Sequence, residues 1–271
     1  MSRPKIAFIG GGNMATSLIS GILDEGYPSS HITVSGPTEE KLFRLNQKFG
    51  INTTTDNSIA AAGAEIILLS VKPKMVKPVS LELSAFLKHR PLVISVAAGI
   101  PLLSLQKWLG TGVPVIRCMP NTPALVQTGA TGLFADTDVS SEQCALATEI
   151  FNAVGVCCWL EKEEDLDVVT AVSGSAPAYF FLFMEAMEKT AIELGLSQEV
   201  ARKLILQTAL GAAKMAIENG AEPAELRRRV TSPAGTTEAA INTFLEGDIL
   251  GLFDKAMASC VRRAKELAQE A

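Results

Sequence analysis

A glycine-rich turn near the start of the chain has the residue types and the spacing of a dinucleotide-binding site. The segment KIAFIGGGNMATSLISGIL reads as an apolar strand, a turn and an amphipathic helix. Gly10 allows a sharp turn, Gly12 lets the backbone approach a pyrophosphate, and Ala15 lets helix and strand pack closely. The N–H groups near Asn13 and Met14 then point at the phosphates from a helix N-terminus. The turn therefore predicts that the protein binds a dinucleotide.

The end of the second predicted strand indicates which dinucleotide. A site for NAD usually has Asp or Glu about 20 residues beyond the glycines, where it binds the ribose 2′-hydroxyl. Here Ser35 and Pro37 stand in the sequence SGPT at that point, and Lys41 and Arg44 follow on the next helical pattern. Hydroxyl, N–H and cationic groups tolerate a 2′-phosphate, although both cations could equally be solvated charges of the helix. We therefore expect NADP as the cofactor, with NADPH preferred and NADH accepted as the alternative.

Small and turn-forming residues also follow the later predicted strands. Ligands of open α/β sheets bind at the carboxyl ends of their strands. Ala97 and Ala98 would leave room for a flat nicotinamide ring, and Lys72 could reach a phosphate or ribose oxygen. The further predicted cofactor-binding residues are Asn57, Val71, Lys72, Pro73, Ala97 and Ala98, and those predicted to contact the substrate here are Pro120 and Asn121.

A second stretch of small residues, TSPAGTT at 231–237, stands between two helical patterns. The free N–H groups at a helix N-terminus are a ready receptor for a carboxylate. The alternative is a connector in which Ser or Thr only caps a helix. A connector does not easily explain Pro-Ala-Gly between two helices, so we expect a substrate site here.

Composition limits the class of protein. The chain has 271 residues, of which 48% are apolar and 20% charged, as expected of a packed globular protein. Its net charge of -5 argues against nucleic acid or an anionic membrane as the main partner. The five Cys form no CxxC pair, which favours reduced thiols and no metal site. No apolar run reaches the roughly 18 residues of a membrane span, and no secretory segment is recognisable, so we expect a cytoplasmic protein.

The pattern of elements changes once along the chain. Eight short β-branched runs, from KIAFIG to GVCCWL, alternate with helical patterns up to about residue 160. This order predicts an α/β domain with a mostly parallel, Rossmann-type sheet over 1–160. Beyond it, apolar residues recur at helical spacing and predict an all-α domain over 161–271. The helices expected there span 163–172, 176–195, 198–219, 222–230, 237–246 and 249–270.

Five motifs together carry a resemblance to a known family. FIGGGNMA, SVKP, RCMPNTPALVQTGATGLF, VSGSAPAYFF and TSPAGTTEAAI are similar to segments of the pyrroline-5-carboxylate reductases, and the similarity runs essentially end to end. The resemblance implies a Rossmann domain and an all-α dimerisation domain that interlocks with a second subunit. It further implies NAD(P)H-dependent reduction of 1-pyrroline-5-carboxylate, a cyclic imino acid, to L-proline, the last step of proline biosynthesis. In that family, homodimers commonly assemble into a decamer of five dimers.

The resemblance also implies roles within TSPAGTT. Thr237 would be the catalytic residue, since its hydroxyl would orient or protonate the imine nitrogen. The carboxylate would be held by Ser232, Gly235, Thr236 and Thr237. A protonated imine is already an electrophile, so hydride transfer to it needs little beyond positioning and one hydrogen bond. The chain has only two His, His31 and His89, and both are expected at the surface.

Two other functions have the same architecture. A β-hydroxyacid-type NADP-dependent dehydrogenase would have a catalytic Lys in the helix that follows VSGSAP, but no Lys precedes Lys189 there. A non-catalytic NADP(H)-sensing dimer has no need of a carboxylate receptor. We expect Ser173 and Gly174 of VSGSAP to serve packing, and the aromatic residues after them to lie in a core or a dimer interface.

Overall fold

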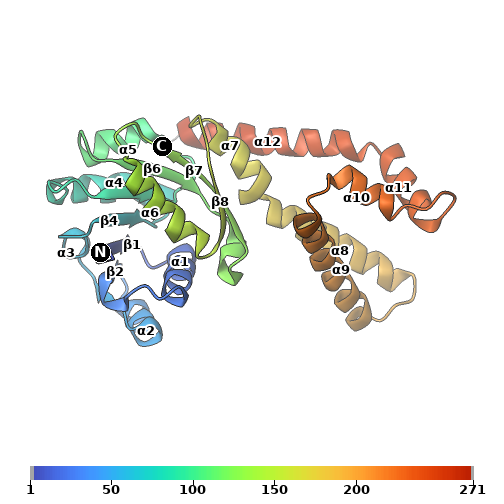
Figure 1. Cartoon of the computed structure of the whole chain (residues 1–271), viewed down its shortest axis with the longest axis horizontal. Helices are drawn as coiled ribbons and strands as arrows, with labels where there is room; N and C mark the ends of the chain where they lie inside the picture. The colour runs from blue at the N-terminus through green and yellow to red at the C-terminus, as the bar shows by residue number, and fades with distance from the viewer. Residues whose placement is uncertain (1–2, 270–271) are drawn as a thin grey trace. The chain divides into compact units, whose positions relative to one another are not determined.

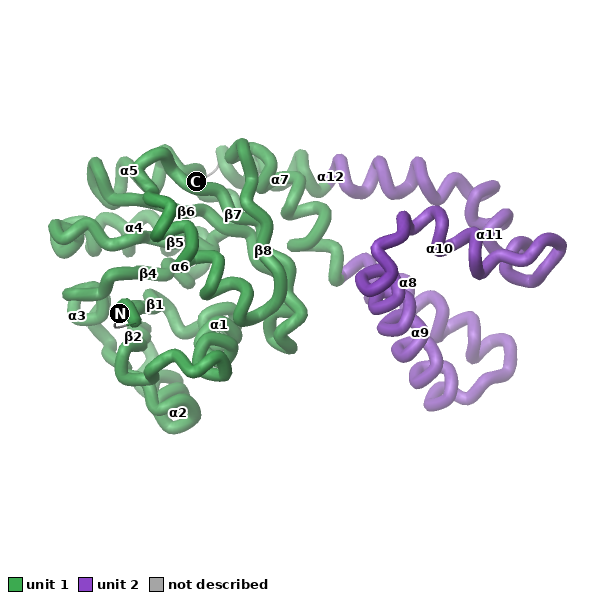
Figure 2. The backbone as a smooth tube through the Cα atoms, viewed as in Figure 1, with its two compact units in different colours: residues 1–177, 260–271 green, residues 178–259 purple. Residues whose placement is uncertain are grey.

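The computed structural model describes residues 3–269, and their contacts divide the chain into two compact units (Figure 2). The first unit runs to Pro177 and resumes at Cys260, and the second spans Ala178–Ser259. The last helix of the chain thus begins in the second unit and ends in the first. The division between residues 160 and 161 that the sequence suggested stays a prediction.

The first unit is built on one eight-stranded sheet in the order β3-β2-β1-β4-β5-β6-β7-β8 (Figure 1). All neighbouring strands are parallel except β6 and β7, which run antiparallel. The predicted mostly parallel sheet is therefore confirmed. The strands are β1 (Ile6–Ile9), β2 (Ile32–Ser35), β3 (Asn52–Thr54), β4 (Ile66–Leu69), β5 (Leu92–Ser95), β6 (Val115–Met119), β7 (Gly129–Ala135) and β8 (Gly155–Trp159).

Helices cover both faces of this sheet, which explains why its central strands are apolar throughout. Successive strand residues point to opposite faces. In β1, Phe8 therefore packs in one hydrophobic cluster, with Leu18 and Phe151, while Ile9 packs in another, with Val76. The helices are α1 (Asn13–Asp24), α2 (Glu39–Phe49), α3 (Asn57–Ala61), α4 (Pro73–Leu83), α5 (Leu102–Leu109), α6 (Ser141–Asn152) and α7 (Asp165–Val169), with 3-10 turns η1 (Ser29–His31), η2 (Ser84–Phe86) and η3 (Thr122–Val126).

The second unit is entirely helical, as predicted. A π-helical turn, η4 (Thr170–Gly174), follows α7 and leads into the remaining helices. These are α8 (Ala176–Glu193), α9 (Gln198–Asn219), α10 (Pro223–Arg229), α11 (Thr236–Glu246) and α12 (Ile249–Gln269). Each differs from its predicted span by no more than two residues at either end, as frayed or capped helix ends do.

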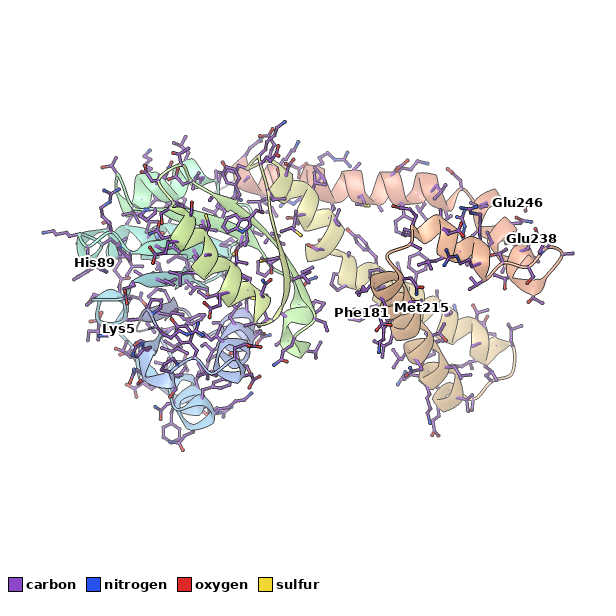
Figure 3. All side chains as sticks on the ribbon, viewed as in Figure 1. Lys5, His89, Phe181, Met215, Glu238 and Glu246 are labelled. Atoms are coloured by element: carbon purple, nitrogen blue, oxygen red, sulfur yellow. The ribbon has the colours of Figure 1, made fainter. Side chains whose placement is uncertain are left out.

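The helical unit leaves much of its apolar surface uncovered. Phe181 on α8 is 64% exposed and Met215 on α9 is 51% exposed (Figure 3). Phe183 and Phe253 stack with their ring centroids 5.9 Å apart, and both rings line an apolar hollow of about 450 Å³ within this unit. Monomeric proteins rarely expose contiguous apolar patches of this kind. The unit therefore requires a further surface to cover it.

One helical stretch among the described residues, Asp165–Glu193, is long and apolar enough to cross a membrane by length and composition alone. No apolar run of this length was expected from the sequence, because the stretch becomes continuous only when α7, η4 and α8 join. Only 11% of its most apolar window is buried within the chain. Contacts within the single chain therefore leave most of this stretch exposed.

Candidate active site

The turn between β1 and α1 has the geometry of a phosphate cradle. Gly10 has a φ of 103°, and a Cβ atom there would lie 2.7 Å from the carbonyl oxygen of Ser70, so only glycine fits. Gly12 is the N-cap of α1 and provides no side-chain cap. No residue within 3–269 accepts a hydrogen bond from the N–H groups of Asn13 and Met14. The start of α1 therefore has free N–H donors, which suit a phosphate group, and their contact with a dinucleotide stays a prediction.

A hollow of about 160 Å³ joins this turn to the end of β2. Its lining includes Pro37 and one charged residue, Lys41, for which no ion-pair partner is found among the described residues. Arg44, by contrast, forms an ion pair of 2.5 Å with Glu40 on the outside of α2. Of the two cations noted in the sequence, only Lys41 lines this hollow, and its contact with a 2′-phosphate stays a prediction. The lining also includes Gly11, Gly36, Thr38 and Leu42, which were not among the predicted cofactor-binding residues, although the helical pattern of α2 could have indicated Leu42.

Ser35 and Asn57 are brought together by the fold. Ser35 is completely buried, and its hydroxyl donates to Oδ1 of Asn57 over 2.7 Å. Nδ2 of Asn57 in turn donates to Glu82 over 3.2 Å. The hydroxyl of Ser35 thus has an internal partner, and its direct contact with a cofactor stays a prediction.

The residues predicted at the ends of β4 and β5 lie in two different settings. Val71 is partly buried and packs close to Gly10, while Lys72 and Pro73 are exposed at the start of α4. Ala97 is buried and Ala98 partly buried in the loop after β5. A small side chain at each of these last two positions leaves the loop surface open, which is compatible with a flat ring above it.

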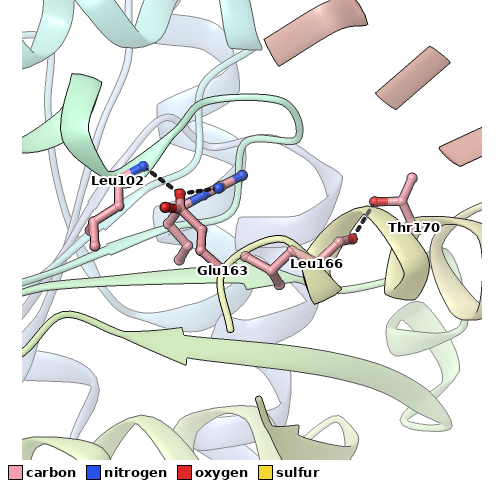
Figure 4. A network of polar contacts seen from close by, with 5 residues as sticks. Leu102, Glu163, Leu166 and Thr170 are labelled. Carbon is pink, nitrogen blue, oxygen red and sulfur yellow. Dashed lines mark hydrogen bonds and ion pairs between the residues drawn. The ribbon is translucent and has the colours of Figure 1, made fainter. Parts of the chain in front are cut away.

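A polar network fixes the far end of the loop after β5 (Figure 4). A carboxylate oxygen of Glu163 accepts from the N–H of Leu102 over 2.6 Å and also forms an ion pair with Arg117. Asp167 lies on the same side of the unit, where burial raises the pKa of its carboxyl and the charge of Arg117 opposes the rise. Glu163 was not among the residues that sequence reasoning selected, because its partners are 61 and 46 residues away in the chain.

The residues Pro120 and Asn121, predicted to contact the substrate, are buried within the first unit. Nδ2 of Asn121 donates to the carbonyl oxygen of Ser173 over 3.1 Å, and Oδ1 accepts from the N–H of Ala130 over 2.9 Å. The amide therefore ties the turn after β6 to β7 and to the π-helical turn. Contact of these two residues with the substrate stays a prediction.

The stretch TSPAGTT forms the entry to α11. The helix begins at Thr236, one residue earlier than expected, with Gly235 as its N-cap and no side-chain cap. The N–H groups of Thr236 and Thr237 find no acceptor within 3–269. The carboxylate of Glu238 turns back to accept from the N–H of Ala234 over 2.7 Å. The side chains of Ser232, Thr236 and Thr237 are exposed.

The entry to α11 thus combines unpaired backbone donors with exposed hydroxyls. The N–H of Gly235 donates to the carbonyl oxygen of Ser232 over 3.0 Å, which closes the turn. The next two N–H groups, those of Thr236 and Thr237, have no acceptor within 3–269. Such a helix start can receive a small anion and place a hydroxyl beside it. The geometry of this second site is therefore suited to a carboxylate that carries a hydrogen-bonding group.

The fold and the phosphate cradle define an oxidoreductase with an NADP-binding domain. Residues 5–99 match the family model described as NADP oxidoreductase, coenzyme F420-dependent, and residues 163–267 match the one described as pyrroline-5-carboxylate reductase dimerisation. The chain belongs to the pyrroline-5-carboxylate reductase family. It is 51% identical over 270 residues to the pyrroline-5-carboxylate reductase of Pseudomonas aeruginosa, covering 100% of this chain and 99% of the relative.

Solved structures agree with this assignment. A pyrroline-5-carboxylate reductase from Coxiella burnetii superposes with a TM-score of 0.94 at 44% identity, over 98% of both chains. The pyrroline carboxylate reductase of Plasmodium falciparum, solved with NADP bound, superposes with a TM-score of 0.87 at 27% identity, over 99% of both chains. A reductase from Vibrio alginolyticus is 46% identical over 98% of each chain.

Family membership confirms the enzyme class expected from the motifs. The chain is an oxidoreductase of proline biosynthesis that reduces 1-pyrroline-5-carboxylate to L-proline. The comparisons therefore do not support a β-hydroxyacid-type dehydrogenase or a non-catalytic sensor. The region that matches the dimerisation family model includes the apolar stretch Asp165–Glu193.

Proposed function

We propose that the substrate carboxylate binds at the N-terminus of α11 and that Thr237 is the catalytic residue. The observation that carries this proposal is the pair of unpaired N–H groups of Thr236 and Thr237 beside exposed hydroxyls. The backbone donors, together with Ser232 and Gly235, hold the carboxylate. The hydroxyl of Thr237 then hydrogen-bonds the imine nitrogen.

The chemistry requires only a few groups from the chain. NADPH would transfer a hydride to the carbon of the protonated imine, and the electron pair of the C=N π bond would pass to the nitrogen, which keeps its proton. The products would be L-proline and NADP⁺. Thr237 orients the nitrogen and stabilises the charge that changes there during transfer. The helix N-terminus favours the anionic substrate by its partial positive charge. No side chain with a shifted pKa near neutrality is needed, because the imine is activated by its own protonation.

NADPH is proposed as the preferred cofactor, with NADH accepted as the alternative. The free ammonium of Lys41 in the hollow beside Gly12 and Pro37 supports recognition of a 2′-phosphate, and no carboxylate lines that hollow. We therefore add Lys41 to the proposed cofactor-binding residues, as the group that distinguishes NADPH from NADH.

The homodimer is proposed to assemble further, into a decamer of five dimers, in the cytoplasm. The apolar hollow and the exposed aromatic residues of the helical unit support an extensive interface between subunits. The net charge of -5 supports the absence of nucleic-acid and membrane partners.

One assay tests the proposed function directly. Purified protein is mixed with NADPH, and its oxidation is followed by absorbance with and without 1-pyrroline-5-carboxylate, with proline measured as product. We expect oxidation only with the imine and a larger kcat/KM with NADPH than with NADH. Oxidation of NADPH without proline formation, or equal use of both nucleotides, would contradict the proposal.

A further inference from the structure

Glu163 joins three parts of the first unit through one carboxylate. It lies just before α7, and a single oxygen both accepts from the N–H of Leu102 and pairs with the guanidinium of Arg117 (Figure 4). Arg117 belongs to β6, opposite Ser95 of the neighbouring strand β5. The side chain of Arg117 is 11% exposed and that of Glu163 is 31% exposed, so water screens the attraction between the two charges only in part.

The bond to Leu102 compensates for the sequence at the start of α5. The N-cap of this helix is Pro101, which has no side chain that can accept a hydrogen bond from the first turn. A helix start leaves its first N–H groups without intrahelical partners. Glu163 therefore caps α5 from 61 residues away, and its negative charge is also favourable at a helix N-terminus.

The loop between β5 and α5 is consequently held at both ends. At one end Val96 donates to Leu69 over 3.2 Å, within the sheet, and Ala97 donates to Oγ of Ser95 over 3.4 Å. At the other end stands the bond from Leu102 to Glu163. Between them lies Gly99 with a φ of 73°, packed so closely that a Cβ would lie 3.3 Å from Leu267 near the end of α12.

We infer that Glu163 is a positioning residue for hydride transfer, because it fixes the loop that presents Ala97 and Ala98 to the nicotinamide. The inference rests on the proposed placement of the cofactor at these two residues. Hydride transfer depends steeply on the position of the donor ring, and a misplacement of about 1 Å can reduce the rate roughly a hundredfold. A loop anchored at both ends limits such displacement, whereas release of Leu102 frees one end.

The arrangement also explains why a carboxylate is needed rather than a neutral cap. An uncharged acceptor could still bond the N–H of Leu102, but Arg117 would lose its ion-pair partner and keep only the charge of Asp167, with which it forms no ion pair. Arg117 directly precedes Cys118 and Met119 at the end of β6. The ion pair and the helix cap therefore depend on the same group.

The test compares Glu163→Ala and Glu163→Gln with Glu149→Gln. Glu149 pairs with Arg3 in the same unit and is half exposed, so its substitution removes one charge and one ion pair away from the loop. Hydrogen–deuterium exchange of the peptide that covers residues 96–103 is measured without any ligand. We expect faster exchange at Leu102 in Glu163→Ala, a smaller change in Glu163→Gln, and parental exchange in Glu149→Gln.

Binding and turnover complete the experiment. For Glu163→Ala we expect kcat to fall about tenfold to a hundredfold, the isotope effect on kcat with NADPH deuterated at C4 to increase, and KM for the imine to stay within about twofold. NADPH affinity, measured by fluorescence, should fall several-fold. Parental exchange at Leu102, or parental kcat with faster exchange, would overturn the inference. The inference would also be overturned if the loss of activity matched a smaller folded fraction measured by thermal unfolding.

The outcome is separable from that of the proposed function. Failure of the parental enzyme to reduce the imine would refute the proposed function. An active parental enzyme with an unaffected Glu163→Ala variant refutes the inference alone.

Discussion

The hydroxyl of Ser35 donates a hydrogen bond of 2.7 Å to Oδ1 of Asn57 and so joins the end of β2 to the start of α3. The position where many dinucleotide-binding folds place a carboxylate is here occupied by a buried hydroxyl. The hydroxyl of Ser35 therefore already has a partner within the chain. Because this hydroxyl is buried and hydrogen-bonded, substitutions at Ser35 are expected to change the free energy of unfolding.

Ser35→Asp is expected to destabilise the protein. The new carboxylate would be buried facing the carbonyl oxygen of Asn57, so a charge would lose water without gaining a donor. The free energy of unfolding should fall by about 3 kcal/mol, against about 1 kcal/mol for Ser35→Ala, which only removes the hydrogen bond. Urea denaturation followed by circular dichroism measures both. Equal midpoints for parent and Ser35→Asp would show that the hydroxyl is not enclosed as described.

Lys41→Ala is expected to weaken discrimination between the two nucleotides. Among the described residues, the ammonium of Lys41 is the only charged group that lines the hollow beside Gly12 and Pro37, so its loss removes one proposed contact with a 2′-phosphate. The kcat/KM with NADPH should fall roughly tenfold, which corresponds to about 1.4 kcal/mol, and that with NADH should change little. Arg44→Ala is the matched control, because Arg44 is already paired with Glu40. If both variants lose NADPH efficiency equally, Lys41 is not the selective group.

Thr237→Ala is expected to impair catalysis while the fold is retained. Loss of one donor to a charge that changes in the transition state should lower kcat/KM by roughly tenfold to a thousandfold. NADPH affinity should be nearly unchanged, since the phosphate cradle lies in the β1–α1 turn. Steady-state kinetics and fluorescence titration measure the two effects.

Two further variants sharpen the test of Thr237. Thr237→Ser keeps a hydroxyl and should retain most of the activity. Ser232→Ala should mainly raise KM for the imine, because it weakens carboxylate binding. Parental kcat and KM in Thr237→Ala would instead show that TSPAGTT is a connector, and the substrate would then have to be sought at 119–122.

Phe180→Asp is expected to disrupt the dimer. Phe180 on α8 is 64% exposed in the single chain, and a carboxylate at an apolar interface opposes association through the cost of its desolvation. Light scattering should give a parental mass of at least twice the 28.7 kDa of one chain and a lower mass for the variant. Phe43→Asp on α2 is the control, because Phe43 is equally exposed but lies in the sheet-containing unit. A parental mass in Phe180→Asp would exclude this part of α8 from the interface.

The sequence determined by itself those features that depend on local pattern. Short β-branched runs separated by helical periods predicted all eight strands, and the spacing of Gly10, Gly12 and Ala15 predicted the turn between β1 and α1, because a sharp turn, a close approach and a helix start are all short-range requirements. The all-α character of the second half followed from helical periodicity for the same reason. The five motifs also indicated the correct family.

Tertiary structure alone decided which residues meet across the chain. Nothing local to Glu163 indicates that it caps α5 beside Leu102 or pairs with Arg117, and the burial of Ser35 and Asn121 depends on packing between distant elements. The antiparallel β6–β7 pair is likewise set by the path of the connection between the strands, because strand composition specifies pairing direction only weakly. Hydrogen bonds and ion pairs act over a few ångströms in space, whereas a sequence pattern records only neighbours along the chain.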